Sequence, residues 1–487
     1  MDSNNKISYN FAMKYYITTP IYYINDIPHI GHAYTSTAAD VLARYHRNLG
    51  DEVFFLTGTD EHGAKIAEAA AAANLEPKQF ADTLVPKFQA MAKKLNISYD
   101  EFFRTTDPQH ETLVQDFVTQ LQTKGFVEKR KYEGLYCVGC EKFLKESDLV
   151  DGLCPDHKKA PVAQTEENYF FKLSAFGDQL LAKINSGELE IGPDSRKNEV
   201  LGKIKQGLED ISISRQAVEW GISFPEDKSQ TIYVWIDALL NYCTATKIYG
   251  KEDFWPANLH LVGKDILWFH AIIWPALLMA LNLPTPKKVF AHGFFTVNGG
   301  KMSKTIGNVI DPIETVEKYG TDAVRYALLS EFPFGEDGDI SLAKIESLYN
   351  KLANNIGNLF QRTISMINKY EVVIPTSSVI PAQAGILPNK QLPIGPDLDN
   401  LDFMGAIRKI DKFAEETNQF IAEKQPWTLT KEGKKSEVEA VLLAAYDNLT
   451  IIAETIAPFT PETAEKMKKQ LETLEPQVLF PRLDTDS

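Results

Sequence analysis

The sequence contains few cysteines, no long apolar run and no excess of basic residues. Four cysteines in 487 residues are too few for a disulfide scaffold. No apolar stretch reaches the roughly 20 residues that a membrane-spanning helix needs, so we expect no membrane partner. The net charge of −15 gives no general attraction to nucleic acid, although a local basic stripe can still bind phosphates on an acidic protein.

The first ten residues are polar and contain no apolar segment of the kind found in signal peptides. We therefore expect a cytoplasmic protein. The length of the chain predicts about three domains. A hydrophobic content of 44% is close to the average of globular proteins and is sufficient for a sizeable core.

Strand-like and helical segments alternate from residue 14 onwards. Residues 14–19 (KYYITT) and 52–57 (EVFFLT) have the composition of buried strands, and a helix is expected between them over 29–49. This alternation is typical of a parallel α/β sheet of the Rossmann type. Ligands of such sheets bind at the carboxyl ends of the strands, so the loops at 20–32 and 58–63 are candidate sites.

The rest of the chain shows three further patterns. Short apolar runs and turns over 127–224 suggest an inserted module. The α/β pattern then returns, with strand-like runs at residues 231–237, 260–263 and 288–297. From about residue 340 the sequence reads as helical, except for a Pro-, Gly- and Ser-rich stretch at 372–396 that predicts a loop. We therefore expect four segments: 1–126, 127–224, 225–339 and 340–487.

The segment PHIGH places His29 and His32 around Gly31 at the expected start of a helix. Free N–H groups and the helix dipole attract phosphate at such a start, and two imidazoles can donate hydrogen bonds to a reacting phosphate. Glycine lets a nucleotide approach the backbone closely. The alternative is that both histidines merely cap a helix, although chance would give this pattern only about 0.01 times per chain.

A second basic motif, GGKMSK, follows an apparent strand near residue 297. Gly299 and Gly300 can act as a hinge, and Lys301 and Lys304 can then reach a polyphosphate as compact charges. Taken alone, the motif is better explained as an exposed basic loop, because such loops are common.

Three of the four cysteines lie close together, in the pattern C-x2-C-x13-C-x2-H. Both pairs have the spacing of a zinc knuckle, and three thiolates with one imidazole complete a closed, tetrahedral structural zinc site. Four unrelated loop residues are the weaker alternative, because most of the chain's cysteines take part. The predicted ligands are Cys137, Cys140, Cys154 and His157.

Together, the motifs PHIGH and KMSK resemble the HIGH and KMSKS signatures of class I aminoacyl-tRNA synthetases, with Thr305 in place of the final serine. The blocks TTPIYYINDIPHIGHAYT, TGTDEHG, YVWIDALLNY and GKDILWFHAIIWPA narrow the resemblance to the methionyl-tRNA synthetase family, of the bacterial type with one zinc knuckle. The resemblance implies a Rossmann-type catalytic domain, a zinc-binding connective insertion and a C-terminal α-helical anticodon-binding domain.

The resemblance also implies an activity: methionine–tRNA ligase, which forms methionyl-adenylate from ATP and transfers methionine to the 3′-terminal adenosine of tRNA(Met). It assigns phosphate chemistry to His29, His32, Lys301 and Lys304, and binding of the methionine ammonium to Asp60. Gly31, Gly263 and Asp265 would contact ATP, and Arg215 would lie near the site. The methionine pocket would comprise Ile21, Tyr23, Trp235, Ala238, Tyr242, Ile266 and His270.

Aromatic and aliphatic walls suit a polarizable thioether, and Tyr23 or His270 could contact the sulfur. For most residues of the blocks YVWIDALLNY and GKDILWFHAIIWPA, a place in the core remains the better interpretation. Magnesium is expected with ATP, and the zinc is expected to be structural. A monomer is the expected state.

In the C-terminal region, Trp427 follows Pro426 and could stack on an anticodon base, as single-stranded RNA often requires. An equally good alternative is that it seals a helix junction. Asn350 and Asn354 lie where the family places an anticodon-contacting helix.

Two other functions remain open from the sequence. A synthetase for leucine, isoleucine or valine is disfavoured because 127–224 is too short for a large editing insertion. A cysteine enzyme is disfavoured because the predicted zinc ligands are far from the PHIGH motif in the sequence. A related RNA-binding protein without catalysis is disfavoured by the intact His29, His32, Asp60, Lys301 and Lys304.

Overall fold

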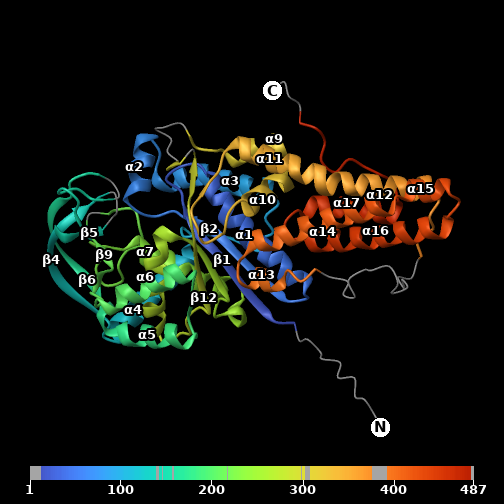
Figure 1. Cartoon of the computed structure of the whole chain (residues 1–487). Coiled ribbons are helices and arrows are strands. Elements are labelled where there is room, and N and C mark those ends of the chain that lie inside the picture. The colour runs from blue at the N-terminus through green and yellow to red at the C-terminus, as the bar shows by residue number, and fades with distance from the viewer. Residues whose placement is uncertain are drawn as a thin grey trace, which may run out of the picture. The chain divides into compact units, whose positions relative to one another are not determined.

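The computed structural model describes residues 12–138, 142–144, 146–155, 158–216, 218–297, 299–301, 308–375 and 392–483 (Figure 1). These residues form two compact units. The first contains the chain as far as Ile27, His46–Gln89 and Tyr99–His292. The second contains Pro28–Tyr45, Ala90–Ser98 and the described chain from Gly293 onwards. Among the helices of these ranges, none is both long and apolar enough to cross a membrane.

The first unit is built on a six-stranded sheet with the order β3-β2-β1-β11-β12-β7, in which all neighbouring strands are parallel. An α/β sheet of this kind confirms the predicted fold class. Its strands are nearly continuously apolar because parallel sheets are buried on both faces. The strands are β1 (Lys14–Tyr23), β2 (Glu52–Asp60), β3 (Glu101–Arg104), β7 (Glu190–Gly192), β11 (Leu259–Gly263) and β12 (Lys288–His292).

The remaining strands of the first unit form smaller sheets. A four-stranded sheet has the order β5-β4-β6-β8, with β4 and β6 antiparallel along ten residue pairs, and β9 pairs with β10. The range 127–224, expected as one inserted module, therefore holds this sheet but also supplies β7 to the main sheet. The bounds are β4 (Val127–Cys137), β5 (Lys142–Leu144), β6 (Val162–Phe171), β8 (Ile211–Ser212), β9 (Ser214–Arg215) and β10 (Thr231–Ile232).

Six α-helices of the first unit connect these strands, and α7 and α8 contribute many of their side chains to its main apolar core. Trp274 of α8 is fully buried there. The helices are α2 (Ala64–Ala72), α4 (Pro108–Thr123), α5 (Gly177–Ser186), α6 (Asp194–Lys205), α7 (Val234–Ile248) and α8 (Trp274–Ala280). Helix α3 (Pro77–Lys94) begins in the first unit and ends in the second.

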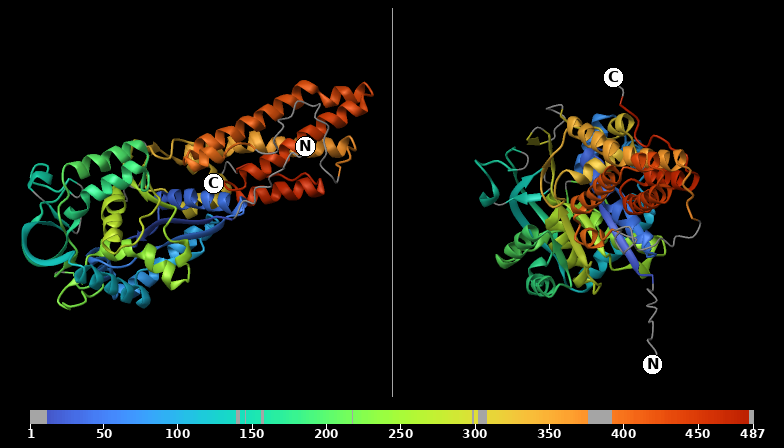
Figure 2. Two further views of the ribbon diagram at one scale, coloured as in Figure 1. Left: turned by 90° about the horizontal axis from the view of Figure 1, so that it is seen from below. Right: turned by 45° about the vertical axis from the view of Figure 1, so that its right-hand side comes forward.

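Helices dominate the second unit, as the sequence predicts for the region beyond residue 340. In both Figure 1 and Figure 2, helices α12, α14, α16 and α17 run alongside one another. The helices are α1 (Ile30–Asn48, assigned to this unit up to Tyr45), α9 (Pro312–Tyr319), α10 (Thr321–Ser330), α11 (Leu342–Leu352), α12 (Asn358–Lys369), α13 (Gly395–Asp399), α14 (Phe403–Lys424), α15 (Pro426–Lys431), α16 (Lys435–Ile456) and α17 (Pro461–Thr473). A small sheet joins β13 (Phe295–Val297), β14 (Gly300–Lys301) and β15 (Gly338–Asp339).

Three expectations about local structure were wrong. Strand β1 does not end at Thr19 but continues to Tyr23, with a shift in its pairing with β2 between Thr18 and Ile21. The shift coincides with Pro20, which has no N–H to donate to the ladder. Within the expected strand 231–237, only Thr231–Ile232 form a strand, β10. The remaining apolar residues belong to helix α7, which begins at Val234.

The third correction concerns residues 288–297, which form two strands in different sheets instead of one. Gly293 lies between them, where a Cβ atom would come within 2.1 Å of the carbonyl oxygen of Glu336. The chain therefore needs glycine to pass so close to a neighbouring backbone. The loop expected at 372–396 lies largely outside the described residues, and α13 begins at Gly395.

Gly58 of β2 is expected to be one of the least replaceable positions of the main sheet. A Cβ atom there would lie 2.2 Å from the carbonyl oxygen of Phe103 in β3, so Gly58→Ala must push two paired strands apart. We expect a loss of about 2 kcal/mol or more in the free energy of unfolding, measured by urea denaturation.

The matched control is Gly202→Ala in α6, where an added Cβ atom meets nothing within 4 Å. This change should be neutral or slightly stabilising, because alanine favours helix over glycine. Equal stability of the two variants would contradict the close approach at Gly58.

Candidate functional site

Three polar residues, Asp60, Glu61 and His62, follow one another at the carboxyl end of β2. Glu61 is fully buried and accepts hydrogen bonds from Arg104 Nε and Nη2, at 2.6 and 2.7 Å, and from Thr106 Oγ1 at 2.6 Å. Its carbonyl oxygen also accepts a bond from Trp220 Nε1 at 2.6 Å. These contacts fix the backbone that presents Asp60 and His62 on either side.

His62 makes a buried ionic contact with helix α7. Its Nδ1 lies 2.8 Å from Asp237 Oδ2, and His110 Nε2 of α4 lies 2.7 Å from Asp237 Oδ1. Burial opposes the charge on both groups, but the partner charges outweigh it: Asp237 raises the pKa of His62, and the two histidines lower the pKa of Asp237. Asp237 therefore ties the start of α7 to the end of β2.

Helix α7 and the segment after β11 bring together three of the predicted pocket residues. The rings of Trp235 and Phe269 are stacked at 3.8 Å, and His270 meets Trp235 edge-on at 6.4 Å. Tyr242 Oη lies 2.8 Å from His270 Nε2. His270 belongs to a π-helix, Phe269–Ile273, a local widening that often occurs at functional sites.

The hydrogen bonds of His270 define its protonation state. Its Nδ1 lies 3.0 Å from the carbonyl oxygen of Ile266, which can only accept, so Nδ1 carries the proton. Burial lowers the pKa of His270 to about 4, so the ring is neutral at pH 7 and Nε2 accepts the hydrogen of the Tyr242 hydroxyl. Contact of the methionine sulfur with Tyr23 or His270 stays a prediction.

The other pocket residues lie on the neighbouring strands and on α7. Tyr23 of β1 pairs in register with Asp60 of β2, and Ile21 pairs with Gly58. Ala238 is buried on α7, one turn before Tyr242. Burial raises the pKa of Tyr242, and the nearby Tyr22 and Asp60 raise it further. Asp60 is placed beside β1 by its pairing with Tyr23, at the carboxyl end of β2.

Gly263 and Asp265 lie at the carboxyl end of β11, next to β1 in the centre of the sheet. Strand β11 ends at Gly263. A 3-10 helix, Lys264–Ile266, follows and leaves Asp265 exposed. This is the edge at which parallel sheets bind ligands, as the sequence pattern predicts.

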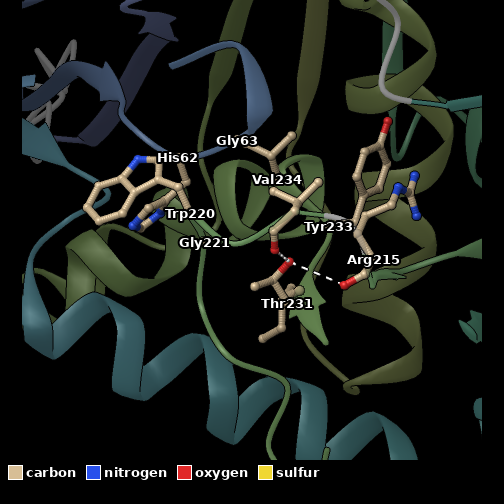
Figure 3. A pocket seen from close by; sticks show the side chains of 10 residues that line it. His62, Gly63, Arg215, Trp220, Gly221, Thr231, Tyr233 and Val234 are labelled. Carbon is tan, nitrogen blue, oxygen red and sulfur yellow. Dashed lines mark hydrogen bonds between the residues drawn. The ribbon is translucent and has the colours of Figure 1, made fainter. Parts of the chain in front are cut away.

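A small pocket of the first unit lies beside His62 (Figure 3). Figure 3 shows His62 with Trp220 on one wall and Arg215 with Tyr233 on another. The Arg215 guanidinium lies 3.9 Å from the Tyr233 ring centre, and its Nη1 donates to the carbonyl oxygen of Ser214 at 2.7 Å. Arg215 is therefore held in place by the protein, and its role in catalysis stays a prediction.

In the second unit, His29 and His32 lie at the start of α1 with their rings stacked at 3.9 Å. The N–H of His29 donates to His32 Nδ1 at 3.0 Å, and the N–H of Gly31 donates to His29 Nδ1 at 3.1 Å. With Nδ1 as the acceptor, each neutral ring carries its proton on Nε2. Burial, together with His29, lowers the pKa of His32 well below its ordinary value.

Gly31 makes room for this arrangement. A Cβ atom at this position would lie 2.9 Å from Cε1 of His29. A larger residue would therefore displace the His29 ring from its present position, in addition to hindering the close approach of a nucleotide that the sequence suggests.

Only part of the lysine loop lies within the described residues. Gly300 and Lys301 form β14, which pairs antiparallel with β13, and Gly299 adopts a φ of 74° that favours glycine. Lys304 lies outside the described residues. The N–H of Ile30, at the start of α1, donates to the carbonyl oxygen of Ile310 at 3.2 Å. The start of α1 thus lies against the segment that follows the loop.

Two of the four predicted zinc ligands lie within the described residues. Cys137 and Cys154 are buried and share a small apolar cluster with Leu144. The carbonyl oxygen of Cys154 accepts from the N–H of Lys158 at 2.8 Å. Cys140 and His157 lie outside the described residues. Within the described ranges, no group of three or more His, Cys, Asp or Glu side chains could hold a metal.

The predicted anticodon residues lie on the surface of the second unit. Asn350 and Asn354 are exposed and one helical turn apart. Trp427 is 38% exposed, whereas the preceding Pro426 is buried. The surface position that stacking requires is available, but these assignments stay predictions.

Comparison with known proteins agrees with this geometry. The family model "tRNA synthetases class I (M)" matches residues 15–160 and 156–364. The chain belongs to this family. It is 45% identical to the methionine–tRNA ligase of Caldanaerobacter subterraneus subsp. tengcongensis, over 97% of this chain and 79% of that one. The ligase of Nostoc sp. is 41% identical, over 97% and 91% of the two chains.

A solved structure of the family is also similar. Mycobacterium tuberculosis methionyl-tRNA synthetase in complex with methionyl-adenylate has a TM-score of 0.88 and 36% identity, covering 96% of this chain and all of that one (100%). The resemblance inferred from the motifs is therefore confirmed. Sequence reasoning missed His62, His110 and Asp237 of this class I synthetase, although an aspartate inside the apolar run VWIDALL is a signal for a buried polar contact.

The depressed pKa of His270 has a consequence for stability. The unfolded chain binds a proton at this residue below about pH 6.5, whereas the folded chain does so only below about pH 4. Stability is therefore lost as the pH falls from about 6.5 to 4, by about 3 kcal/mol. Unfolding free energies of the unchanged chain and of His270→Gln, measured across this interval, should differ by that amount in their pH dependence. Parallel curves would show that His270 titrates normally.

Proposed function

We propose that the chain uses ATP to attach methionine to tRNA(Met). One observation carries the proposal: Trp235, Tyr242 and His270 form a connected aromatic group in the first unit. The buried Asp60 ends β2 of the same unit, in register with Tyr23 of β1. Apolar and aromatic side chains suit the thioether, and the carboxylate suits the ammonium of an amino acid. The family match and the names of the relatives support the same activity.

In the first step, the carboxylate of methionine attacks the α-phosphate of ATP, pyrophosphate leaves, and methionyl-adenylate forms. No protein nucleophile is needed, because positioning and charge stabilisation are sufficient. His29 and His32 donate from Nε2 to the reacting phosphate, and Lys301 and Lys304 bind the pyrophosphate. Magnesium accompanies ATP and neutralises phosphate charge.

In the second step, a hydroxyl of the terminal ribose of tRNA, the 2′-OH, attacks the adenylate and releases AMP. Gly31, Gly263 and Asp265 would contact ATP. The C-terminal helices would hold the anticodon through Trp427, Asn350 and Asn354. The four-segment division, the cytoplasmic location and the monomeric state belong to the same proposal.

A structural zinc ion is the second part of the proposal. Cys137 and Cys154 fit the metal, since both thiols are buried in one small cluster apart from the main core. Cys140 and His157 would complete the ligand set. A closed site of four protein ligands leaves no position for substrate, so the ion would stabilise the local fold.

The activity is tested by methionine-dependent exchange of labelled pyrophosphate into ATP, run with a panel of amino acids. We expect exchange with methionine and far weaker exchange with leucine, isoleucine, valine and cysteine. Faster exchange with another amino acid would assign a different synthetase. Absence of exchange, together with binding of tRNA, would favour an RNA-binding protein without catalysis.

Lys304→Ala is expected to slow exchange by at least tenfold while changing the dissociation constant of methionine less than twofold. The lysine would bind the departing pyrophosphate, whereas the methionine pocket is made by other residues. Lys412→Ala, which removes an exposed lysine of α14, is the matched control and should retain normal exchange. Normal exchange by Lys304→Ala would contradict the role of the loop.

Cysteine variants test the zinc site. The purified chain should contain about one zinc ion per molecule, and Cys154→Ser should lose it. Cys243→Ser replaces a cysteine that is equally buried but belongs to the main core, and it should retain the metal. Elemental analysis measures both, and equal zinc content in the two variants would rule out Cys154 as a ligand.

A further inference from the structure

Helix α10 directs three polar side chains, Asp322, Arg325 and Tyr326, to different parts of the second unit. Asp322 accepts from the N–H of Thr463 in α17, and Tyr326 donates to Asp411 of α14 at 2.6 Å. Arg325 lies between them in the sequence and is fully buried. Charged side chains are rarely buried unless they are paired. The partners of Arg325 therefore show which segments α10 holds together.

The Arg325 guanidinium contacts four oxygen atoms from three separate segments of the chain. Its Nε, Nη1 and Nη2 donate to the carbonyl oxygens of Phe459, Leu95 and Pro458, each at 2.9 Å. Nη2 also lies 2.6 Å from Oδ2 of Asp40. Since Asp40 is near the middle of α1, Arg325 joins the helix that begins with the two histidines to the ends of α3 and α16.

Asp40 is as fully bonded as its partner. Its Oδ2 also accepts from Arg44 Nε at 2.7 Å, and its Oδ1 accepts from the N–H and hydroxyl of Ser98, both at 2.6 Å. Burial would raise the pKa of Asp40, but the guanidinium groups of Arg325 and Arg44 outweigh it and lower the pKa below its ordinary value. The carboxylate is therefore held ionised, in one geometry, on a buried face of α1.

Helix α1 has a second attachment, at its first residue, where the N–H of Ile30 donates to the carbonyl oxygen of Ile310. Ile310 and Arg325 belong to one continuous stretch, residues 308–330, that contains α9 and α10 and directly follows the lysine loop. The two attachments are about 15 Å apart along the helix axis, given a rise of 1.5 Å per residue. A rigid helix held at two points cannot tilt against the stretch that holds it.

We propose that Arg325 is a positioning residue: through Asp40 it fixes α1, so that His29 and His32 keep their place relative to the segment carrying the lysine loop. The inference rests on the proposed function. A displacement of about 1 Å in a catalytic group can cost 10²-fold in rate, so a small tilt of α1 is sufficient to slow adenylate formation. The methionine pocket is built from the first unit and does not depend on this pair.

The experiment compares two neighbouring changes on α10. Arg325→Lys keeps the charge but cannot make the four contacts of the guanidinium. It should lower the kcat of methionine-dependent pyrophosphate exchange at least tenfold, with the KM for methionine changed less than twofold. Tyr326→Phe is the matched control: it removes one equally buried hydrogen bond, to Asp411, and should lower the melting temperature without lowering kcat.

Three outcomes would overturn the inference. The first is an unchanged kcat in folded Arg325→Lys, and the second is an equal loss of kcat in Tyr326→Phe. If Arg325→Lys does not fold, Asp40→Asn takes its place with the same expected split between kcat and KM. Failure of both to fold is the third outcome and would leave the pair a purely structural role. Absence of exchange in the unchanged chain would overturn the proposed function. Normal exchange in the unchanged chain with any of the three outcomes would overturn only the positioning role of Arg325.

Discussion

The contact of Asp237 with His62 and His110 is the constraint on which the candidate site depends. The carboxylate is buried, and each of its oxygens faces one imidazole. A buried charge pair is costly to break, because removing one partner leaves the other uncompensated. The contact therefore sets the distance between helix α7, which carries Trp235 and Tyr242, and the end of β2, which carries Asp60.

The two units differ in the chemical environment that their buried polar contacts create. In the first, Tyr242 and His270 are joined by a hydrogen bond between neutral groups, because burial keeps the imidazole uncharged at pH 7. In the second, a stacked imidazole pair is presented at a helix start, and buried ionic contacts hold that helix in place. An amino acid and a polyphosphate require these opposite environments.

The sequence predicts four strands of the main sheet, β1, β2, β11 and β12, and the start of α1, because apolar runs mark them locally. It does not predict the short strands β3 and β7. The sequence fails to predict the ends of strands that are set by contacts with distant residues. Strand β1 continues through Pro20 because it pairs with β2 as far as Tyr23. The run at 288–297 divides at Gly293, where the backbone of Glu336 passes close by. The candidate site residues within family motifs are named by the resemblance to the family. His110, Asp40 and Arg325 could not be predicted, since their partners lie far away in the sequence and leave no local pattern.

The central claim is that the aromatic group and Asp60 bind methionine. A crystal structure of the chain with methionine tests it most directly. The account predicts the thioether among Trp235, Tyr242 and His270, with the ammonium within hydrogen-bond distance of the Asp60 carboxylate. Methionine bound elsewhere, or its ammonium paired with a different carboxylate while Asp60 remains without contact to it, would contradict the account.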